Sequence, residues 1–149
     1  MIVDRIAELE AWRGKELGTS EWVEIDQDRI DRFAAATGDD QWIHTNPARA
    51  AEGPFGTTIA HGFLTLSLVI PMWTEILDVV DATTKVNYGL NKVRFPAPVP
   101  VNSKIRMTAT LAELESIPGG AQLTVTAVVE CDATPKPVCV AEPVFRFYT

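Results

Sequence analysis

Apolar residues near the start of the chain recur at helical spacing. Residues 2–13 carry apolar side chains four and three positions apart and end at Gly14, which predicts a helix followed by a terminating glycine. The alternating segment 22–25 predicts a short strand. Directly after it, Asp26 can cap a helix that Gly38 closes. This helix has an apolar stripe at i, i+3, i+4 and i+7: Ile30, Phe33, Ala34 and Thr37.

The most apolar segment of the chain follows a glycine-rich loop. Before the loop, Asn46, Pro47 and Gly53 supply the cap, the first-turn proline and the terminal glycine of a compact helix. After it, residues 63–70 are apolar on every side, and such a helix is buried within a fold rather than lying on its surface. Pro71 is expected to kink or end this helix.

From about residue 83 onward the pattern changes to that of β-strands. Five strands are predicted, with a proline-rich stretch after the second: residues 85–88, 92–95, 104–115, 122–131 and 138–148. Within residues 122–131 the apolar positions alternate, which is typical of a strand with one buried face. Antiparallel strands after one buried helix predict an α+β fold in which the sheet wraps around that helix.

Composition narrows the range of partners. The 149 residues are 46% hydrophobic and 22% charged, as in an ordinary globular domain. A net charge of -7 argues against binding to nucleic acid or to an anionic membrane surface. The start of the chain lacks a signal-peptide core, and no apolar stretch reaches the roughly 18 residues of a membrane span. Cys131 and Cys139 fit no disulfide framework, so we expect buried free thiols and a cytoplasmic protein.

Positive charge is concentrated in one part of the chain. The range 82–112 contains no Asp or Glu but has five basic residues: Lys85, Lys92, Arg94, Lys104 and Arg106. Lys92 and Arg94 are two positions apart and therefore project from one face of a strand. Lys104 and Arg106 repeat that spacing on what is expected to be the neighbouring strand. The four predict a patch for the phosphates of an anionic ligand, although solvated strand faces would have the same composition.

A carboxylate and an imidazole lie five residues apart, just after the helix that Gly38 closes. Asp39 is followed by His44, one of only two histidines in the chain. If this segment is irregular, both side chains can converge on one water. A neutral imidazole, with a reference pKa of about 6.5, can accept or donate a proton at neutral pH, and a carboxylate can share that work. The alternative is that Asp39 accepts a hydrogen bond at the helix end and His44 is a core histidine bonded to backbone.

These residues resemble a known family motif. Gly38-Asp39 followed by His44, and then His61-Gly62 opening an apolar helix, resemble the MaoC-like, R-specific enoyl-CoA hydratase family of hot-dog proteins, whose motif is G-D-x-N-P-x-H with a later H-G pair. The segment 88–99 is similar to the family's R-F-x-x-P-V stretch. Gln41-Trp42 stands where the family usually has Asn and Pro. The resemblance is closer to the subset that includes nodulation-protein-N-like dehydratases.

The resemblance implies a reaction and a hot-dog fold. Asp39 and His44 would hold one water between them. One would take its proton as it adds to the β carbon of a trans-2-enoyl thioester, and the other would give a proton to the α carbon from the same face. The product would be the (R)-3-hydroxyacyl thioester of CoA or of acyl carrier protein. Gly62 would offer its backbone N–H to the enolate-like oxygen. A homodimer without a cofactor is implied, with residues 1–149 as a single domain and 1–20 as an N-terminal helical extension.

Other features have two interpretations. His61 can line the pocket or make a structural hydrogen bond across the loop. Ser67 can hydrogen-bond Asp39 or bond back to its own helix. Asp39, His44 and His61 have the residue types of a metal site, but their spacing matches no zinc pattern and no metal is expected. A hot-dog acyl-CoA thioesterase and a non-catalytic acyl-thioester-binding subunit are the alternative functions.

Overall fold

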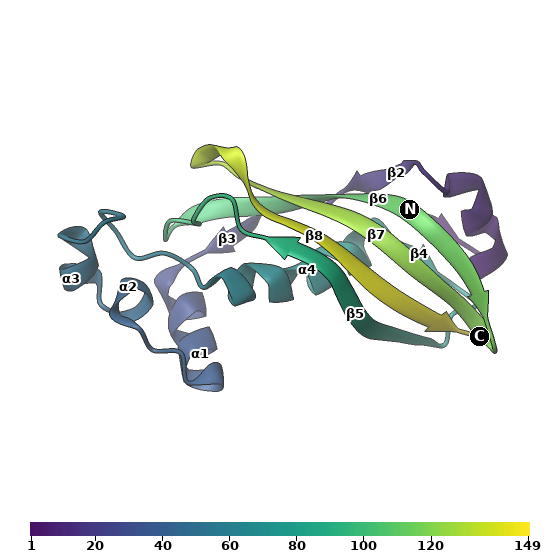
Figure 1. Cartoon of the computed structure of the whole chain (residues 1–149), viewed down its shortest axis with the longest axis horizontal. Helices are drawn as coiled ribbons and strands as arrows, with labels where there is room; N and C mark the ends of the chain where they lie inside the picture. Colours follow the sequence, from purple (N-terminus) through teal and green to yellow (C-terminus); the bar gives the residue numbers. More distant parts are fainter.

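A computed structural model describes all residues, 1–149, and shows a long antiparallel sheet curving around a single helix (Figure 1). This confirms the α+β fold predicted from the sequence. Five strands follow one another across the sheet: β2 (Glu16–Thr19), β6 (Ser103–Ile117), β7 (Gly120–Cys131), β8 (Thr134–Tyr148) and β5 (Thr84–Arg94). The sixth strand, β3 (Val23–Ile25), pairs with the beginning of β6.

The long strands have one buried face because their apolar residues alternate. Along β7 every second residue is buried, from Ala121 to Cys131, as the sequence predicts. The β6–β7 hairpin turns at Gly119, whose φ of +78° favours glycine. At Gly120 a Cβ would lie 1.9 Å from the carbonyl oxygen of Phe147, so only glycine fits there. The two cysteines, Cys131 in β7 and Cys139 in β8, are free and buried, as expected.

Helix α4 (Gly62–Ile76) fills the concave side of the sheet. It is buried on several sides, and its Trp73 ring stacks on Phe145 of β8 with centroids 5.1 Å apart. The helix does not end at Pro71 but continues five residues to Ile76. Pro71 is exposed and removes a single hydrogen bond, while the buried residues that follow it hold the last turn against the sheet. No helix in the structure is both long enough and apolar enough to cross a membrane.

The N-terminal segment differs from the predicted helix over 2–13. Residues Ile2–Val3 form β1, which pairs in parallel with β4 (Asp78–Val79), and only Ile6–Trp12 are helical, as the 3-10 helix η1. Long-range bonds decide this outcome, because the Ile6 N–H donates to the Asp81 carboxylate (3.0 Å) rather than to a carbonyl of its own segment. Of the predicted apolar face, Ile6 and Leu9 are nevertheless buried, whereas Ile2 is exposed. Strand β2, which the sequence did not predict, then joins the main sheet.

Three short helices lie beyond one end of the sheet (Figure 1). They are α1 (Gln27–Thr37), α2 (Trp42–Thr45) and α3 (Pro47–Ala51). The predicted caps are confirmed: the Asp26 side chain accepts from the Arg29 N–H, the Asn46 side chain accepts from the Arg49 N–H, and Gly38 is left-handed. The segment after Gly38, expected to be irregular, contains the one-turn helix α2.

Strand β5 forms a free edge of the sheet. Two predicted short strands are in fact this one strand, which stays paired with β8 through register shifts after Asn87 and after Leu90. Its residues are exposed except for Gly89 and Val93, which are half-buried. An edge of this length presents unpaired backbone N–H and C=O groups to its surroundings.

Candidate active site

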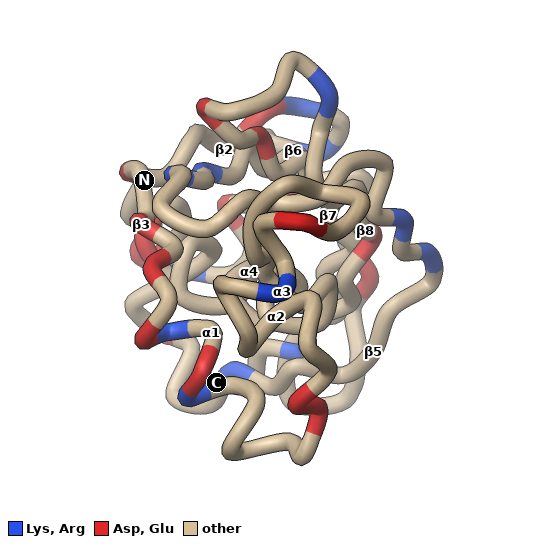
Figure 2. Tube along the Cα trace, turned by 90° about the vertical axis from the view of Figure 1, so that its left-hand side faces the viewer, with Lys and Arg blue, Asp and Glu red and all other residues tan.

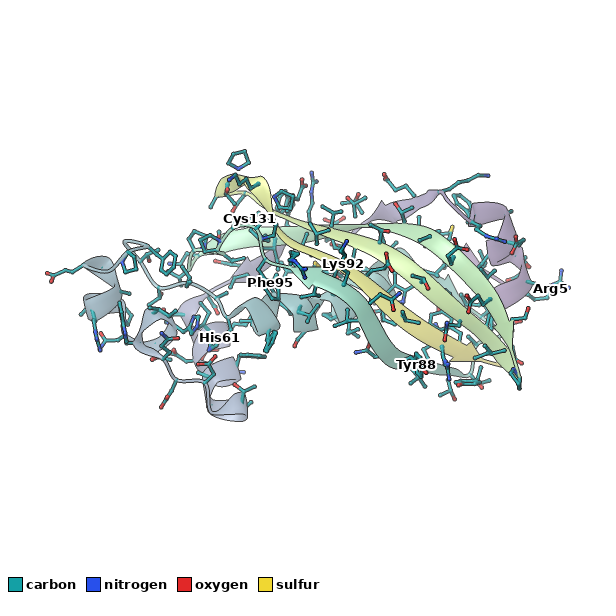
Figure 3. All side chains as sticks on the ribbon, viewed as in Figure 1. Arg5, His61, Tyr88, Lys92, Phe95 and Cys131 are labelled. Atoms are coloured by element: carbon teal, nitrogen blue, oxygen red, sulfur yellow. The ribbon has the colours of Figure 1, made fainter.

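Three elements bring the predicted site residues together. Asp39 follows the glycine that ends α1, His44 lies in α2, and His61 is the residue that precedes α4. Carboxylate and ring-nitrogen atoms of the three side chains lie within 4.8 Å of one another. Figure 3 shows His61 where the short helices meet the start of α4.

His44 is buried and has one defined hydrogen bond. Its Nδ1 lies 2.7 Å from the carbonyl oxygen of Ile59. Because a carbonyl only accepts, Nδ1 carries the hydrogen, and the neutral ring has its lone pair on Nε2. Burial lowers the pKa of His44 below its ordinary 6.5, with the His61 ring adding to this effect, whereas the Ile59 carbonyl and Asp39 act in the opposite direction. The neutral, proton-accepting form therefore persists below pH 6.5.

The backbone of α2 is held by a side chain that the sequence did not single out. Gln27 donates from its Nε2 to the carbonyl of His44 (2.7 Å), and its Oε1 accepts from the hydroxyl of buried Thr58 (2.6 Å). The amide thus joins the first turn of α1 to α2 and to the loop before α4. Its position one residue after the Asp26 cap gave only a helix signal.

His61 makes the structural hydrogen bond that was one of its two interpretations. Its Nε2 lies 2.8 Å from the main-chain carbonyl oxygen of Asp39, so Nε2 carries the hydrogen. The ring stacks on His44, with centroids 3.9 Å apart and planes at 22°. The lone pair of a ring nitrogen lies in the plane of its ring, and the planes of these two stacked rings are nearly parallel. A single metal ion therefore cannot lie in both planes at a bond length of about 2.1 Å from each ring, so the pair is poorly arranged to share one.

A cavity of about 320 Å³ opens beside His44 and the start of α4. Its wall includes Gly62, Thr65 and the rings of Phe55 and Phe95, but neither Asp39 nor His61. Asp39 is exposed, next to this wall rather than in it. As the first residue of α4, Gly62 has an N–H without a partner inside the helix, where the helix dipole is positive. A Cβ at Gly62 would lie 3.1 Å from the Phe95 ring, so a side chain there would crowd the cavity.

The sequence missed part of this wall. Phe95 belongs to the segment that resembles R-F-x-x-P-V, and that resemblance was the signal available for it. Thr65 lies one helical turn after Gly62 and is buried, but within an apolar helix its hydroxyl gave no separate signal. Phe55 lies in the glycine-rich loop, where the sequence has no helical or strand periodicity that could indicate which side chains are buried.

Of the two interpretations of Ser67, the hydrogen bond to Asp39 is wrong. The Ser67 hydroxyl donates instead to the carbonyl of Phe63 one turn earlier (2.7 Å), which is the alternative stated above. Ser67 is exposed and lines a different cavity of about 150 Å³, between α4 and β5. Five positions along a helix turn a side chain well away from the direction of the first residue, and this separates Ser67 from Gly62.

The expected joint patch of basic residues is also wrong. Strands β5 and β6 are not neighbours, because β7 and β8 lie between them. Lys92 and Arg94 are therefore separated from Lys104 and Arg106, and Figure 2 shows basic positions dispersed among acidic ones. Arg106 pairs with the Glu130 carboxylate and lies over the Trp22 ring, 4.4 Å from its centroid. Lys92 and Arg94 come just before Phe95 of the cavity wall, and Figure 3 shows Lys92 and Phe95 at the same end of β5.

A sheet wrapped around one central helix, with an aspartate and a histidine at the start of that helix, defines a hot-dog protein of the MaoC type. The MaoC like domain model matches residues 8–133, and the chain belongs to this family. Among its relatives, 3-hydroxyacyl-thioester dehydratase Z of Mycobacterium tuberculosis is 50% identical over 145 residues, which cover 97% of this chain and 96% of that protein. Nodulation protein N of Rhizobium leguminosarum bv. viciae is 44% identical over 141 residues, covering 91% and 86%.

A solved structure has the same fold. The R-hydratase PhaJ1 from Pseudomonas aeruginosa superimposes with a TM-score of 0.78 at 24% identity, covering 97% of this chain and 85% of that one. The hot-dog architecture predicted from the motifs is therefore confirmed, as is the likeness to the subset that includes nodulation protein N.

Proposed function

We propose that this protein is an (R)-specific enoyl-thioester hydratase, working in reverse as a 3-hydroxyacyl-thioester dehydratase. The observation that carries the proposal is the meeting of Asp39 and His44 beside a cavity that also contains the Gly62 amide. The names of the dehydratase relatives support the same class of reaction. The enzyme is a hydro-lyase, and its substrate is an acyl thioester.

The reaction begins with a water held between Asp39 and His44. Two hydrogen bonds of about 2.8 Å that meet at one water oxygen span roughly 4.6 Å, and the two side chains offer atoms within 4.8 Å of each other. The lone pair on Nε2 makes His44 the group that takes the proton, while the Asp39 carboxylate accepts the second hydrogen of the water and orients it.

Addition then proceeds from one face of the substrate. The water oxygen bonds to the β carbon, the double-bond electrons move toward the thioester carbonyl, and the proton on Nε2 of His44 passes to the α carbon. In this proposal His44 both takes and gives the proton, in place of the two separate groups that the resemblance implies. One water is consumed and both of its parts are delivered from the same side, which gives syn addition. The (R)-3-hydroxyacyl product requires that the substrate present one particular face of its double bond to this water, as the family resemblance implies. The enolate-like oxygen accepts a hydrogen bond from the Gly62 N–H at the positive end of α4.

The carrier and the assembly extend the proposal. Lys92 and Arg94, which come just before Phe95 of the cavity wall, are proposed to contact the phosphates of CoA or of acyl carrier protein. A homodimer is supported by the free β5 edge, on which Val86, Tyr88 and Leu90 are exposed. Light scattering should then give about twice the chain mass of 16.3 kDa, and a monomer at micromolar concentration would contradict the dimer. A cytoplasmic location is proposed because both thiols are buried and unpaired.

The test is an enoyl-thioester absorbance assay with crotonyl-CoA and with a long-chain enoyl-CoA. Asp39→Asn and His44→Ala should each lower turnover about a hundred- to ten-thousand-fold. Asp40→Asn is the matched control, since it removes the adjacent exposed carboxylate and should leave turnover unchanged. Near-normal turnover in folded His44→Ala would refute the assignment. Release of free CoA thiol instead of loss of the double bond would indicate a thioesterase.

A further inference from the structure

His61 is a buried histidine that takes no part in the proton transfers proposed above. It is 2% exposed and lies outside the cavity wall. Its Nε2–H is bonded to the Asp39 carbonyl, and its Nδ1 is a buried nitrogen without a hydrogen-bond partner. Such atoms are rare in folded proteins, because an unpaired buried polar atom destabilises the fold.

We propose that His61 is a positioning residue of the hydratase site: its ring fixes the Asp39 main chain and supports the His44 ring, so that carboxylate and imidazole share one water. This inference rests on the proposed function and deepens it. His61 does not touch the substrate or the reacting atoms in this arrangement.

The bond to Asp39 matters because little else holds that residue. Asp39 comes after the left-handed Gly38, and the Asp39 N–H has only a long contact of 3.4 Å to the Thr37 hydroxyl. The side chain of Asp39 is exposed. The 2.8 Å bond from His61 therefore ties the carboxylate-bearing residue to the beginning of α4, 22 positions further along the chain. Without it the Asp39 carboxylate would be free to move relative to His44.

Stacking gives the second contact. The His61 ring covers one face of His44 at 3.9 Å, and Phe33 of α1 packs on His61 at 4.9 Å with its ring tilted by 55°. The three rings form a series from α1 to α2 that leaves His44 free to point its Nε2 outward. An imidazole that reacts at one nitrogen needs this kind of restraint, since a displacement of about 1 Å can cost about a hundredfold in rate.

The surroundings of His61 fix which of its two ring nitrogens carries the hydrogen. The ionisable groups that face it are His44 from α2 and Asp39 from the turn after α1, while α1 itself contributes the uncharged Phe33. A hydrogen on Nδ1 would be buried without an acceptor, whereas a hydrogen on Nε2 is bonded to the Asp39 carbonyl. The two rings are thus set in opposite tautomers, with hydrogen on Nδ1 of His44 and on Nε2 of His61.

Two substitutions separate the contacts of His61. His61→Gln keeps an N–H near the position of Nε2 but removes the ring, whereas His61→Phe keeps a flat ring and removes the N–H. We expect turnover to fall about a hundredfold or more in His61→Phe and less than about tenfold in His61→Gln, with KM changed less than about threefold in both. In an Asp39→Asn background, His61→Phe should add less than about threefold. Turnover of His61→Phe within about threefold of wild type, or an equal loss in both backgrounds, would overturn the proposal.

A second measurement does not depend on activity. The chain has two histidines, so nitrogen NMR of the wild-type protein shows four ring nitrogens, which His61→Gln assigns. The expected result between pH 6.5 and pH 8, roughly the range around a histidine's reference pKa, is hydrogen on Nε2 of His61 and on Nδ1 of His44. A neutral His61 ring with its hydrogen on Nδ1 instead of Nε2 would overturn the proposal even if His61→Phe failed to fold. Absence of hydratase activity in the wild type would refute the proposed function instead, and the tautomers would still decide the placement of His61.

Discussion

Replacing Gln27 by Leu removes an amide that serves two partners at once. The change keeps the size of the side chain but leaves the buried Thr58 hydroxyl and the His44 carbonyl without their bonds of 2.6 Å and 2.7 Å. An unpaired buried polar group costs about 1–3 kcal/mol. Thr58 is 1% exposed and bears the larger part, while the partly buried His44 carbonyl adds less. We therefore expect Gln27→Leu to lower the free energy of unfolding by about 2–4 kcal/mol.

The same variant should also slow the reaction. Once the His44 carbonyl is released, α2 loses its hydrogen bond to α1, which allows the imidazole to move relative to the cavity. Its bonds to the loop before α4 remain: the His44 ring to the Ile59 carbonyl, and the Ile59 N–H to the Ile43 carbonyl (3.1 Å). A loss of about tenfold in kcat with little change in KM is expected. Urea denaturation gives the stability, and the crotonyl-CoA assay gives the rate.

A double-mutant cycle with Thr58→Val isolates the hydroxyl. The valine removes the donor that Gln27→Leu would leave unpaired, so the double variant should be more stable than the sum of the two single losses predicts, by about 1 kcal/mol or more. A Gln27→Leu loss below about 0.5 kcal/mol, or strict additivity in the cycle, would refute the reasoning. Asp31 also receives a bond from Gln27 on the exposed surface, but its loss contributes little.

Three further outcomes follow from other contacts. The folded state lowers the pKa of His44, so the contribution of this residue to stability is complete above pH 6.5 and is lost as the pH falls below 6.5. The acid limb of the kcat/KM profile should lie below pH 6.5 for the same reason. Urea titrations test the first expectation and a pH–rate profile tests the second, and an acid limb above pH 6.5 would contradict the lowered pKa. Gly120→Ala should cost about 3 kcal/mol or more, whereas Gly119→Ala should cost only about 1–2 kcal/mol through its backbone angle, as thermal melts can measure. Arg94→Ala should raise KM for an enoyl-CoA but not for a truncated enoyl-pantetheine. Arg106→Ala, which breaks an ion pair with Glu130, should leave both KM values unchanged. If Arg94→Ala raised KM equally for both substrates, the nucleotide would have to bind elsewhere.

Local signals in the sequence predicted local structure well. Asp26 and Gly38 marked both ends of α1, Asn46 and Pro47 marked the start of α3, and the alternation in β7 gave its buried face. The meeting of Asp39 with His44 followed from five residues of sequence and a family motif. Each of these features depends on residues that are close together in the sequence, which is why the sequence pattern alone predicts it.

Features that depend on distant partners were not predictable in this way. Ile6 is held by Asp81, so residues 2–13 become a strand and a 3-10 helix rather than the helix their spacing predicts. The order of the strands placed β5 and β6 apart, and no property of Lys92 or Arg106 reveals that order. The bond between His61 and Asp39 likewise joins the turn after α1 to the residue before α4, which are 22 positions apart in the chain.

Burial of the two cysteines determines how this protein behaves toward thiol reagents. Burial raises the pKa of the Cys139 thiol to about 11, which leaves only about one molecule in ten thousand as the reactive thiolate at pH 7. Cys131 is enclosed in the neighbouring strand. The folded enzyme should therefore react very slowly with a coloured disulfide reagent. Any rapid colour development in a thioester assay then comes from the thiol of a released carrier. Slow colour development without substrate would instead report the rate at which β7 and β8 separate and expose the two thiols.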